Sequence, residues 1–180
     1  ELELVANAPT FVGIDMALKH DSIAVVCVPE IEGRLIVRAK IWLPDGDFID
    51  VMDVENYIRK LRDDYDLVEI AYDPAYMQRS AEILSDDSFP MVEFPQSAAR
   101  MVPACGHLYE MIVGGRVAHD GAPVFTDQVL SAAPRSTDQG WRLSKGKSKR
   151  KIDAAIALAM AVDRATRKME AQIVPGFFAN

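Results

Sequence analysis

Cysteine is scarce in this sequence, with only two among 180 residues. Cys27 and Cys105 stand in apolar or small-residue surroundings, and neither belongs to a C-x-x-C pair. The sequence therefore indicates neither a zinc site nor a disulfide framework, and it suits a reducing compartment such as the cytosol.

Long hydrophobic runs are also missing. No apolar segment approaches the roughly 18 to 20 residues that a helix needs to span a bilayer. The first four residues, 1–4, lack the basic and apolar regions of a signal peptide. We therefore expect an intracellular protein that does not enter a membrane.

Positive charge is in the minority, because 27 acidic residues face 20 basic ones and the net charge is −7. Such a balance argues against general coating of nucleic acid, so any contact with DNA must be local. The basic side chains best placed for a DNA contact lie just before the last predicted helix and beside the predicted hairpin. They are Lys145, Lys147, Lys149, Arg150 and Lys151, with Arg135 and Arg142 as further contacts. The alternative interpretation is that the run before the helix is a mobile, solvated loop.

The apolar pattern predicts one α/β domain. Strands are expected at 11–18 and 22–28, then after the turn at Glu32 and Gly33, and again at 67–72 and 91–94. Helices are expected at 50–64, 76–84, 98–112 with an interruption near Pro103, 124–132, and 152 to about 167. A loop-rich return occupies 114–123, and a surface hairpin surrounds 137–139. The fold class is a mixed sheet, antiparallel hairpin strands followed by parallel strands, flanked by helices.

Three carboxylates occur where a solvated acid is not expected. Asp15 lies inside an apolar strand, Asp73 ends a later strand, and Asp153 lies in the first turn of the last helix. Each has a structural alternative. For Asp15 it is a strand-end acid bonded to backbone or basic donors, for Asp73 an Asp-Pro turn, and for Asp153 a carboxylate favoured by the helix dipole.

The predicted fold brings these three carboxylates together, because the first strand, the fourth strand and the last helix would meet. Carboxylate oxygens are the ligands that Mg²⁺ and Mn²⁺ prefer, and two such ions roughly 3.5 to 4 Å apart suit phosphodiester hydrolysis. We therefore expect two divalent cations, Mg²⁺ or Mn²⁺, with Asp15 in contact with both.

The sequence resembles the C-terminal nuclease domain of the large terminase subunits of tailed phages, an RNase H-like fold. The resemblance covers about 11–167 and rests on four segments: 12–15 with Asp21, 70–74, 115–124 and 151–161. It implies that Asp15, Asp73 and Asp153 are catalytic metal ligands. Asp21 matches the additional acidic position near the first strand, as an occasional metal ligand or a support for the ligands, and a turn aspartate is the structural alternative. His119 matches the loop histidine of the family, for which a structural role is the alternative.

The resemblance also implies a function. It predicts an endonuclease that cleaves double-stranded phage DNA during genome packaging, with little sequence specificity, in the cytoplasm of the infected bacterial host. The implied partners are this DNA, an ATPase motor domain in the same full-length polypeptide, the small terminase subunit and the portal.

The ATPase half of that family is not encoded here, because the 180 residues contain no G-x-x-x-x-G-K-[ST] phosphate loop. Since residue 1 is Glu instead of Met, we expect a piece of a longer polypeptide: one nuclease domain over 1–180.

Two other interpretations stay open. Another RNase H-like enzyme, such as a Holliday-junction resolvase or a transposase, would share the carboxylates but not the segment 115–124. A non-catalytic docking module of a packaging motor would keep the carboxylates for structural reasons, and the acidic net charge favours it.

Overall fold

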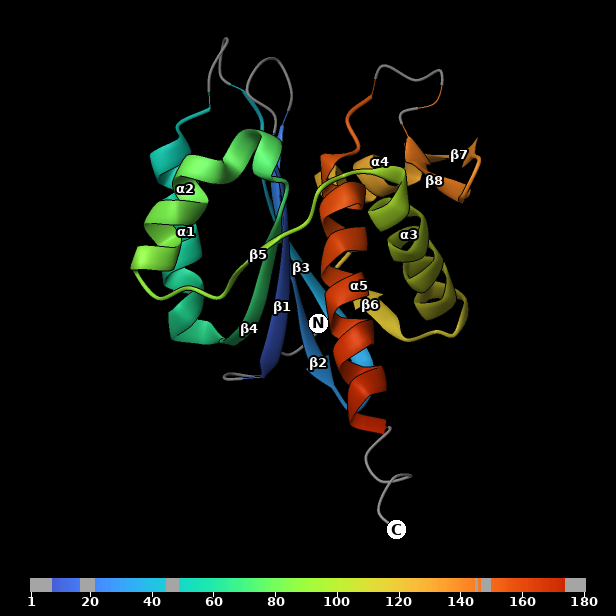
Figure 1. Cartoon of the computed structure of the whole chain (residues 1–180), viewed down its shortest axis with the longest axis horizontal. Coiled ribbons are helices and arrows are strands. Elements are labelled where there is room, and N and C mark those ends of the chain that lie inside the picture. The colour runs from blue at the N-terminus through green and yellow to red at the C-terminus, as the bar shows by residue number, and fades with distance from the viewer. Residues whose placement is uncertain (1–7, 17–21, 45–48, 145, 147–149, 174–180) are drawn as a thin grey trace.

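The computed structural model describes residues 8–16, 22–44, 49–144, 146 and 150–173. Among them, six strands form one sheet in the order β5-β4-β1-β2-β3-β6, and two more form a separate hairpin (Figure 1). The strands of the sheet are β1 (Pro9–Met16), β2 (Ile23–Ile31), β3 (Arg34–Trp42), β4 (Asp66–Tyr72), β5 (Met91–Glu93) and β6 (Val117–His119). The hairpin consists of β7 (Ala133–Thr137) and β8 (Gly140–Ser144).

The sheet mixes the two kinds of pairing. β1, β2 and β3 are antiparallel to one another in succession, whereas β4 is parallel to β1, β5 is parallel to β4, and β6 is parallel to β3. This confirms the predicted fold class. Because β1 and β4 are parallel, their carboxyl ends lie at the same edge of the sheet.

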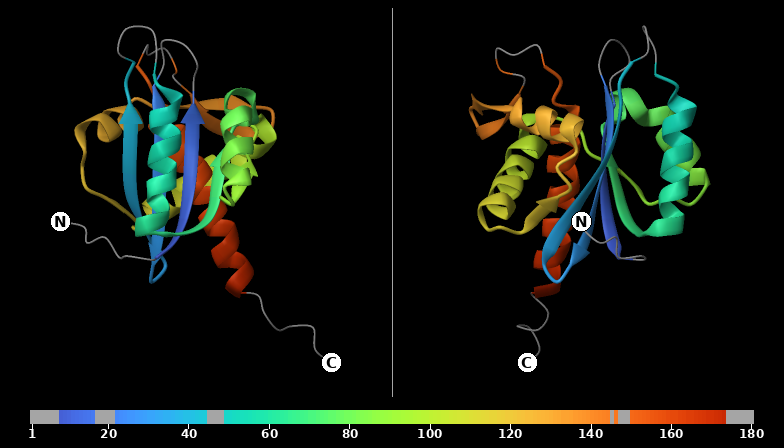
Figure 2. Two further views of the ribbon diagram at one scale, coloured as in Figure 1. Left: turned by 90° about the vertical axis from the view of Figure 1, so that its left-hand side faces the viewer. Right: turned by 180° about the vertical axis from the view of Figure 1, so that it is seen from behind.

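Helices cover both faces of the sheet (Figures 1 and 2). α1 (Val51–Asp64) and α2 (Pro74–Asp86) lie on one side. α3 (Ala98–Val113), α4 (Pro123–Leu130) and α5 (Asp153–Ile173) lie on the other, together with the β7–β8 hairpin. None of the helices in the described part of the chain is long and apolar enough to cross a membrane.

Alternation along the strands produces two separate apolar cores. In β1, Val12 and Ile14 pack in the core beneath α1 and α2, whereas Phe11 packs in the core around α5. The cysteines follow the same division, since Cys27 belongs to the first core and Cys105 to the second. Burial raises the pKa of the Cys27 thiol to about 12, so this thiol is un-ionised at neutral pH.

Helix α5 packs very closely against β1. A Cβ atom placed on Gly13 would lie 2.0 Å from the carbonyl oxygen of Ala157, so only glycine fits at this crossing. Small residues follow on the helix side: Ala154, Ala155, Ala157, Ala159 and Ala161 are all buried. The small residues at the start of the helix thus let it lie directly on the sheet.

The structure departs from the sequence-based expectation at two places. α3 continues through Pro103, because the proline removes only one backbone donor while Met101 and Ala104, on either side, are buried in the core. β6 is a strand within the segment expected to be loop. It pairs with β3 and has three residues, so its pattern is too short to recognise.

Candidate metal centre

Asp15 lies near the end of β1, on the face of the sheet that α5 covers. Its side chain is half-buried, and its Oδ1 atom accepts a hydrogen bond from Gln96 Nε2 at 2.7 Å. Gln96 follows β5, two strands away in the sheet. The carboxylate therefore stands in an otherwise apolar strand with a neutral donor on one oxygen.

Asp153 is at the same end of the molecule as Asp15. Gly13 and Ala157 mark where β1 and α5 touch. From that contact, Asp15 lies two residues along the strand, roughly 6 to 7 Å, and Asp153 lies four residues back along the helix, about 6 Å. The end of β1 and the start of α5 both lie at the top of Figure 1, so the two displacements run in the same direction.

The Asp153 carboxylate is buried, with 4% of the residue exposed. Ser22, the residue before β2, donates a hydrogen bond from its Oγ to Asp153 Oδ2. Ser22 Oγ in turn accepts from Gln128 Nε2 at 3.1 Å, and Gln128 Oε1 accepts from the backbone N–H of Ala154 at 2.8 Å. Polar groups from α4, from the residue before β2 and from α5 are thus joined around one carboxylate.

Asp73 directly follows β4 and neighbours Asp15 in the sheet, because Ile14 pairs with Tyr72 in parallel register. Its side chain caps α2, and its Oδ1 accepts from the backbone N–H of Ala75 at 3.1 Å. These local contacts of Asp73 are the ones expected from the alternative in which it forms an Asp-Pro turn. Asp21 lies outside the described residues.

Among the residues that the structure describes, no three His, Cys, Asp or Glu side chains stand close enough to hold a metal ion. The chemistry of the donor set nevertheless fits a hard divalent cation, since the acids at this edge offer only oxygen ligands. Asp15, Asp73 and Asp153 each have one carboxylate oxygen bonded to a neutral donor. Carboxylates that ligate metals are typically held in this way by surrounding hydrogen bonds.

A buried acid elsewhere in the chain gives a contrast. Asp163 is completely buried in α5, and its carboxylate contacts His107 Nδ1 at 2.8 Å and Arg167 Nε at 2.9 Å. Its charge is therefore balanced by Arg167 inside the chain. The hydrogen bonds from Gln96 to Asp15 and from Ser22 to Asp153 come from uncharged groups, which orient the carboxylates.

The predicted DNA contacts are only partly within the described residues. Lys145, Lys147 and Lys149 lie outside them. Arg150 is exposed and forms an ion pair with Asp127 at 3.0 Å, while the side chain of Lys151 is half-buried. The hairpin places Arg135 directly opposite Arg142, and Arg142 Nη1 donates to the carbonyl oxygen of Gln96 at 3.2 Å. The hairpin is thus linked to the residue that bonds Asp15.

His119 has local contacts that account for its position. It is exposed in β6, its Nδ1 accepts from the backbone N–H of Gly121 at 3.1 Å, and its ring packs against Phe125 at 5.6 Å between centroids. These contacts agree with a structural histidine that orders the turn after β6.

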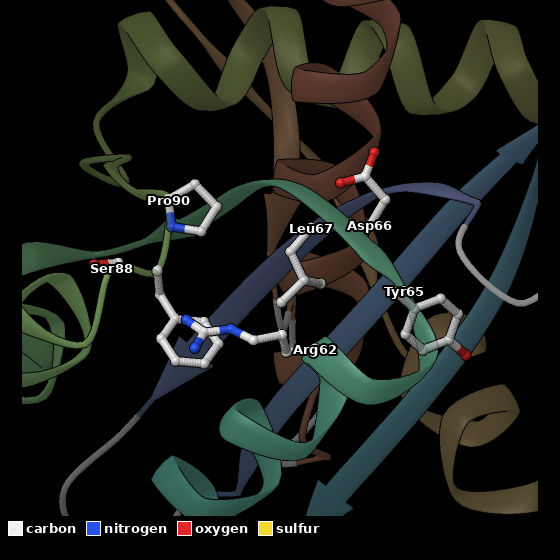
Figure 3. A pocket seen from close by; sticks show the side chains of 7 residues that line it. Arg62, Tyr65, Asp66, Leu67, Ser88 and Pro90 are labelled. Carbon is white, nitrogen blue, oxygen red and sulfur yellow. The ribbon is translucent and has the colours of Figure 1, made fainter.

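A pocket of about 520 Å³ lies at the other end of β4 from Asp73 (Figure 3). Its Arg62 side chain stacks 3.9 Å from the centre of the Phe89 ring and donates to the carbonyl oxygen of Asp87 at 2.8 Å. The pocket contains none of the predicted site residues, and we assign it no part in the candidate centre.

Sequence reasoning missed three residues around the acids: Ser22, Gln96 and Gln128. Ser22 and Gln96 each contact an acid through the fold, at separations of 131 residues for Ser22 and Asp153 and 81 for Gln96 and Asp15, whereas Gln128 contacts Ser22 and the backbone N–H of Ala154. Their one visible signal is a polar residue in an apolar surrounding, as with Ser22 immediately before the buried strand β2.

The arrangement defines a class of domain. A three-stranded antiparallel unit extended by parallel strands, with acids at the ends of β1 and β4 and at the start of α5, is an RNase H-like α/β fold. Residues 36–169 match the family described as terminase large subunit, endonuclease domain. The chain belongs to this family.

Individual relatives agree with this assignment. The large subunit of the terminase of Enterobacteria phage HK97 is 26% identical over 204 residues, covering 94% of this chain and 40% of its own length. The chain therefore spans less than half of that relative. The crystal structure of the HK97 large terminase superposes with a TM-score of 0.77 at 23% identity, over 89% of this chain and 41% of that one.

Two thermophilic phages supply further structures with this fold. The large terminase nuclease of phage G20c with bound magnesium has a TM-score of 0.70 at 15% identity, covering 89% of this chain and 86% of that one. The same nuclease has also been crystallised with cobalt and with zinc. The large terminase of a second thermophilic bacteriophage, in complex with ATP-gamma-S, has a TM-score of 0.68 at 9% identity, covering 90% of this chain and 41% of that one.

Proposed function

We propose that this chain is a metal-dependent endonuclease that cleaves double-stranded phage DNA during genome packaging, with little sequence specificity. The observation that carries the proposal is a terminase endonuclease domain in which Asp15 lies near the end of β1, Asp73 directly follows the parallel strand β4, and Asp153 begins α5. The metals bound by the G20c nuclease support a divalent cation as cofactor.

Each acid has a defined part in this proposal. Asp15 and Asp153 lie at the same end of the β1–α5 contact and would hold the cations, while Asp73 would complete the set by turning from its cap on α2. Two bound Mg²⁺ or Mn²⁺ ions would activate the attacking water and stabilise the leaving 3′-oxygen. Gln96 and Ser22 keep the acids oriented through the bonds they donate.

The proposal is tested by incubating the purified chain with supercoiled plasmid in the presence of Mn²⁺ or Mg²⁺. We expect nicked and linear products that disappear with EDTA, without a preferred cleavage site. Cleavage confined to branched junctions or transposon ends would instead identify a resolvase-like or transposase-like enzyme. No cleavage with any divalent metal would favour a non-catalytic docking module.

The basic hairpin is one proposed DNA contact, linked to the acids through the bond from Arg142 to Gln96. Arg135 and Arg142 are directly opposite each other, and like charges in such a pair destabilise a hairpin. A DNA phosphate between them would relieve this repulsion and fix the position of the backbone. The run 145–151 would add further phosphate contacts just before Asp153.

Replacing Arg135 with Gln is expected to weaken binding to duplex DNA of any sequence and to reduce the slope of log K against log salt by about 1. Fluorescence anisotropy of a labelled duplex, measured without divalent metal over a salt series, gives this slope. Arg79→Gln is the matched control, because Arg79 is an exposed arginine on α2, on the opposite face. An unchanged slope for the Arg135 variant would remove the hairpin from the DNA path.

We also propose the assembly in which this nuclease acts. The chain covers less than half of the HK97 large terminase and of the large terminase crystallised with ATP-gamma-S, a nucleotide analogue. These matches support an ATPase motor domain in the same full-length polypeptide. The small terminase subunit and the portal would be further partners, in the cytoplasm of the infected host.

A further inference from the structure

A largely apolar hollow of about 410 Å³ lies between the end of β3, α4 and the residues just before α5. Two of the side chains that line it are aliphatic and exposed: Leu43 is 55% accessible and Val124 is 44% accessible. Single exposed apolar residues are ordinary on a protein surface. Two of them in one hollow form a small apolar contact surface, and its place in the fold indicates what it contacts.

The register of the sheet places Leu43 close to the candidate metal centre. Asp15 pairs with Ala24 of β2, and Ala24 pairs with Ile41 of β3. Ile41 is therefore level with Asp15 and two strands away, a distance of roughly 10 Å. Because β1 and β3 are both antiparallel to β2, they run in the same direction, and Leu43 follows Ile41 by two residues at the edge where β1 ends.

Val124 reaches the same place from the helix layer. It lies four residues before Gln128 in α4, so the two side chains share one face of the helix, about 6 Å apart along its axis. Gln128 also lines the hollow, and its Oε1 accepts a hydrogen bond from the backbone N–H of Ala154, the residue after Asp153. The hollow therefore adjoins the first turn of α5.

A duplex cleaved at the acids would cover this hollow. The grooves of B-DNA are roughly 6 and 12 Å wide, so a duplex with one phosphate at Asp15 extends over a surface roughly 10 Å away. Arg150 and Lys151 at the rim supply positive charge for phosphates. Leu43 and Val124 offer only aliphatic carbon, and the part of the DNA backbone that suits such a surface is the uncharged sugar.

We propose that Leu43 and Val124 contact deoxyribose in the minor groove of the bound duplex and so select DNA over RNA. This inference rests on the proposed function, because it requires a duplex at the metal centre. The minor groove of an RNA helix displays 2′-hydroxyl groups. Against two aliphatic side chains a hydroxyl group loses water without gaining a hydrogen-bond partner, which is unfavourable. The unsubstituted 2′-carbon of deoxyribose has no such cost.

The expected preference is moderate and confined to a few nucleotides. A closed apolar pocket rejects an added hydroxyl group by roughly 100-fold. This hollow is open, so we expect a smaller effect of about 5- to 10-fold. Successive nucleotides of one strand rise 3.4 Å along the duplex, so a contact roughly 10 Å from Asp15 involves a sugar within about three nucleotides of the cleaved bond.

The test uses the purified chain with Mn²⁺ and an end-labelled DNA duplex that carries one ribonucleotide at a known position. Cleavage with little sequence specificity produces a ladder of fragments, so every bond reports one distance between the ribose and the cut. We expect bonds at one fixed offset from the ribonucleotide to be cleaved about 5- to 10-fold less than in the all-DNA duplex. The two bonds next to the ribonucleotide are left out, because its hydroxyl group there touches the reacting phosphate.

Two variants assign this gap in the ladder to the hollow. Val124→Thr keeps the size of the side chain and adds a hydroxyl group that can bond to a ribose, and Leu43→Asn adds an amide. Each should reduce the gap to about 2-fold or less. Val113→Thr is the matched control, because Val113 is an exposed valine at the far end of α3 from Gln96, and it should retain the full gap. Each gap is measured against the rest of its own ladder, so a change in overall rate cancels.

The outcomes separate this inference from the proposed function. A parent ladder without a gap would overturn the selection of DNA while keeping the nuclease. A gap that both Val124→Thr and Leu43→Asn retain would remove these side chains from the DNA contact. If the parent produced no ladder with Mn²⁺ or Mg²⁺, the proposed function would fall, and the inference with it. Thermal melts of each variant establish that the comparison is made on folded protein.

Discussion

Replacing Asp15 with Asn is expected to reduce metal-dependent DNA cleavage by at least about 1000-fold, since a metal ligand supplies several kcal/mol of transition-state stabilisation and each 1.4 kcal/mol is about tenfold in rate. The amide has the size of the carboxylate, and its oxygen still accepts the bond from Gln96 Nε2. The domain should therefore stay folded. The initial rate of plasmid nicking measures the loss, and a thermal melt measures the fold.

The matched control for this substitution is Asp66→Asn. Asp66 is an exposed aspartate at the first residue of β4, at the opposite end of that strand from Asp73. It loses the same charge without touching the acids, and its cleavage rate should equal that of the parent. If Asp15→Asn retained the parent rate, Asp15 would not be a metal ligand and the catalytic centre would have to be sought elsewhere.

Replacing Gly13 with Ala is expected to destabilise the domain by about 3 kcal/mol or more, at the upper end of the range for overpacked cores. The added methyl carbon would lie 2.0 Å from the oxygen and 2.9 Å from the carbon of the Ala157 carbonyl, and backbone cannot rotate away as a side chain can. For a domain of this size the loss lowers the Tm by roughly 6 to 12 °C. Thermal and urea unfolding measure it.

Gly106→Ala is the control with the opposite sign. Gly106 lies within α3, and a Cβ atom there would meet nothing within 4 Å. Because alanine is a better helix former than glycine, this variant should gain about 0.5 to 1 kcal/mol of stability. Equal effects of the two substitutions would mean that the β1–α5 contact is looser than the structure has it.

Most of the fold was predictable because its elements differ in hydrophobic period. The hairpin strands, the amphipathic helix at 50–64 and the final helix all have patterns long enough to recognise, and all are present. The three-residue strand β6 was not predictable, because its pairing with β3 depends on tertiary contacts. Pro103 gave a misleading signal for the same reason: burial on both sides keeps α3 continuous.

The candidate site was predictable only as a set of acids. Asp15 and Asp153 are conspicuous because a charge in an apolar segment is unusual, and the fold does place them at one end. Asp73 also caps α2, a role that an Asp-Pro sequence favours by itself. Gln96 and Gln128 could not be found, because a glutamine reaches an acid, or a residue that bonds one, only when distant segments meet.

The contact between Gly13 and Ala157 has a consequence for how this domain tolerates changes in length. α5 advances about 100° per residue, so one residue inserted between Asp153 and Ala157 would rotate the acid by that angle away from the sheet. One residue inserted between Gly13 and Asp15 would turn that acid to the opposite face. Substitutions nearby can be absorbed by repacking, but an insertion or deletion in either short interval separates the two acids. We therefore expect both spacings to resist insertions and deletions in functional variants of this chain.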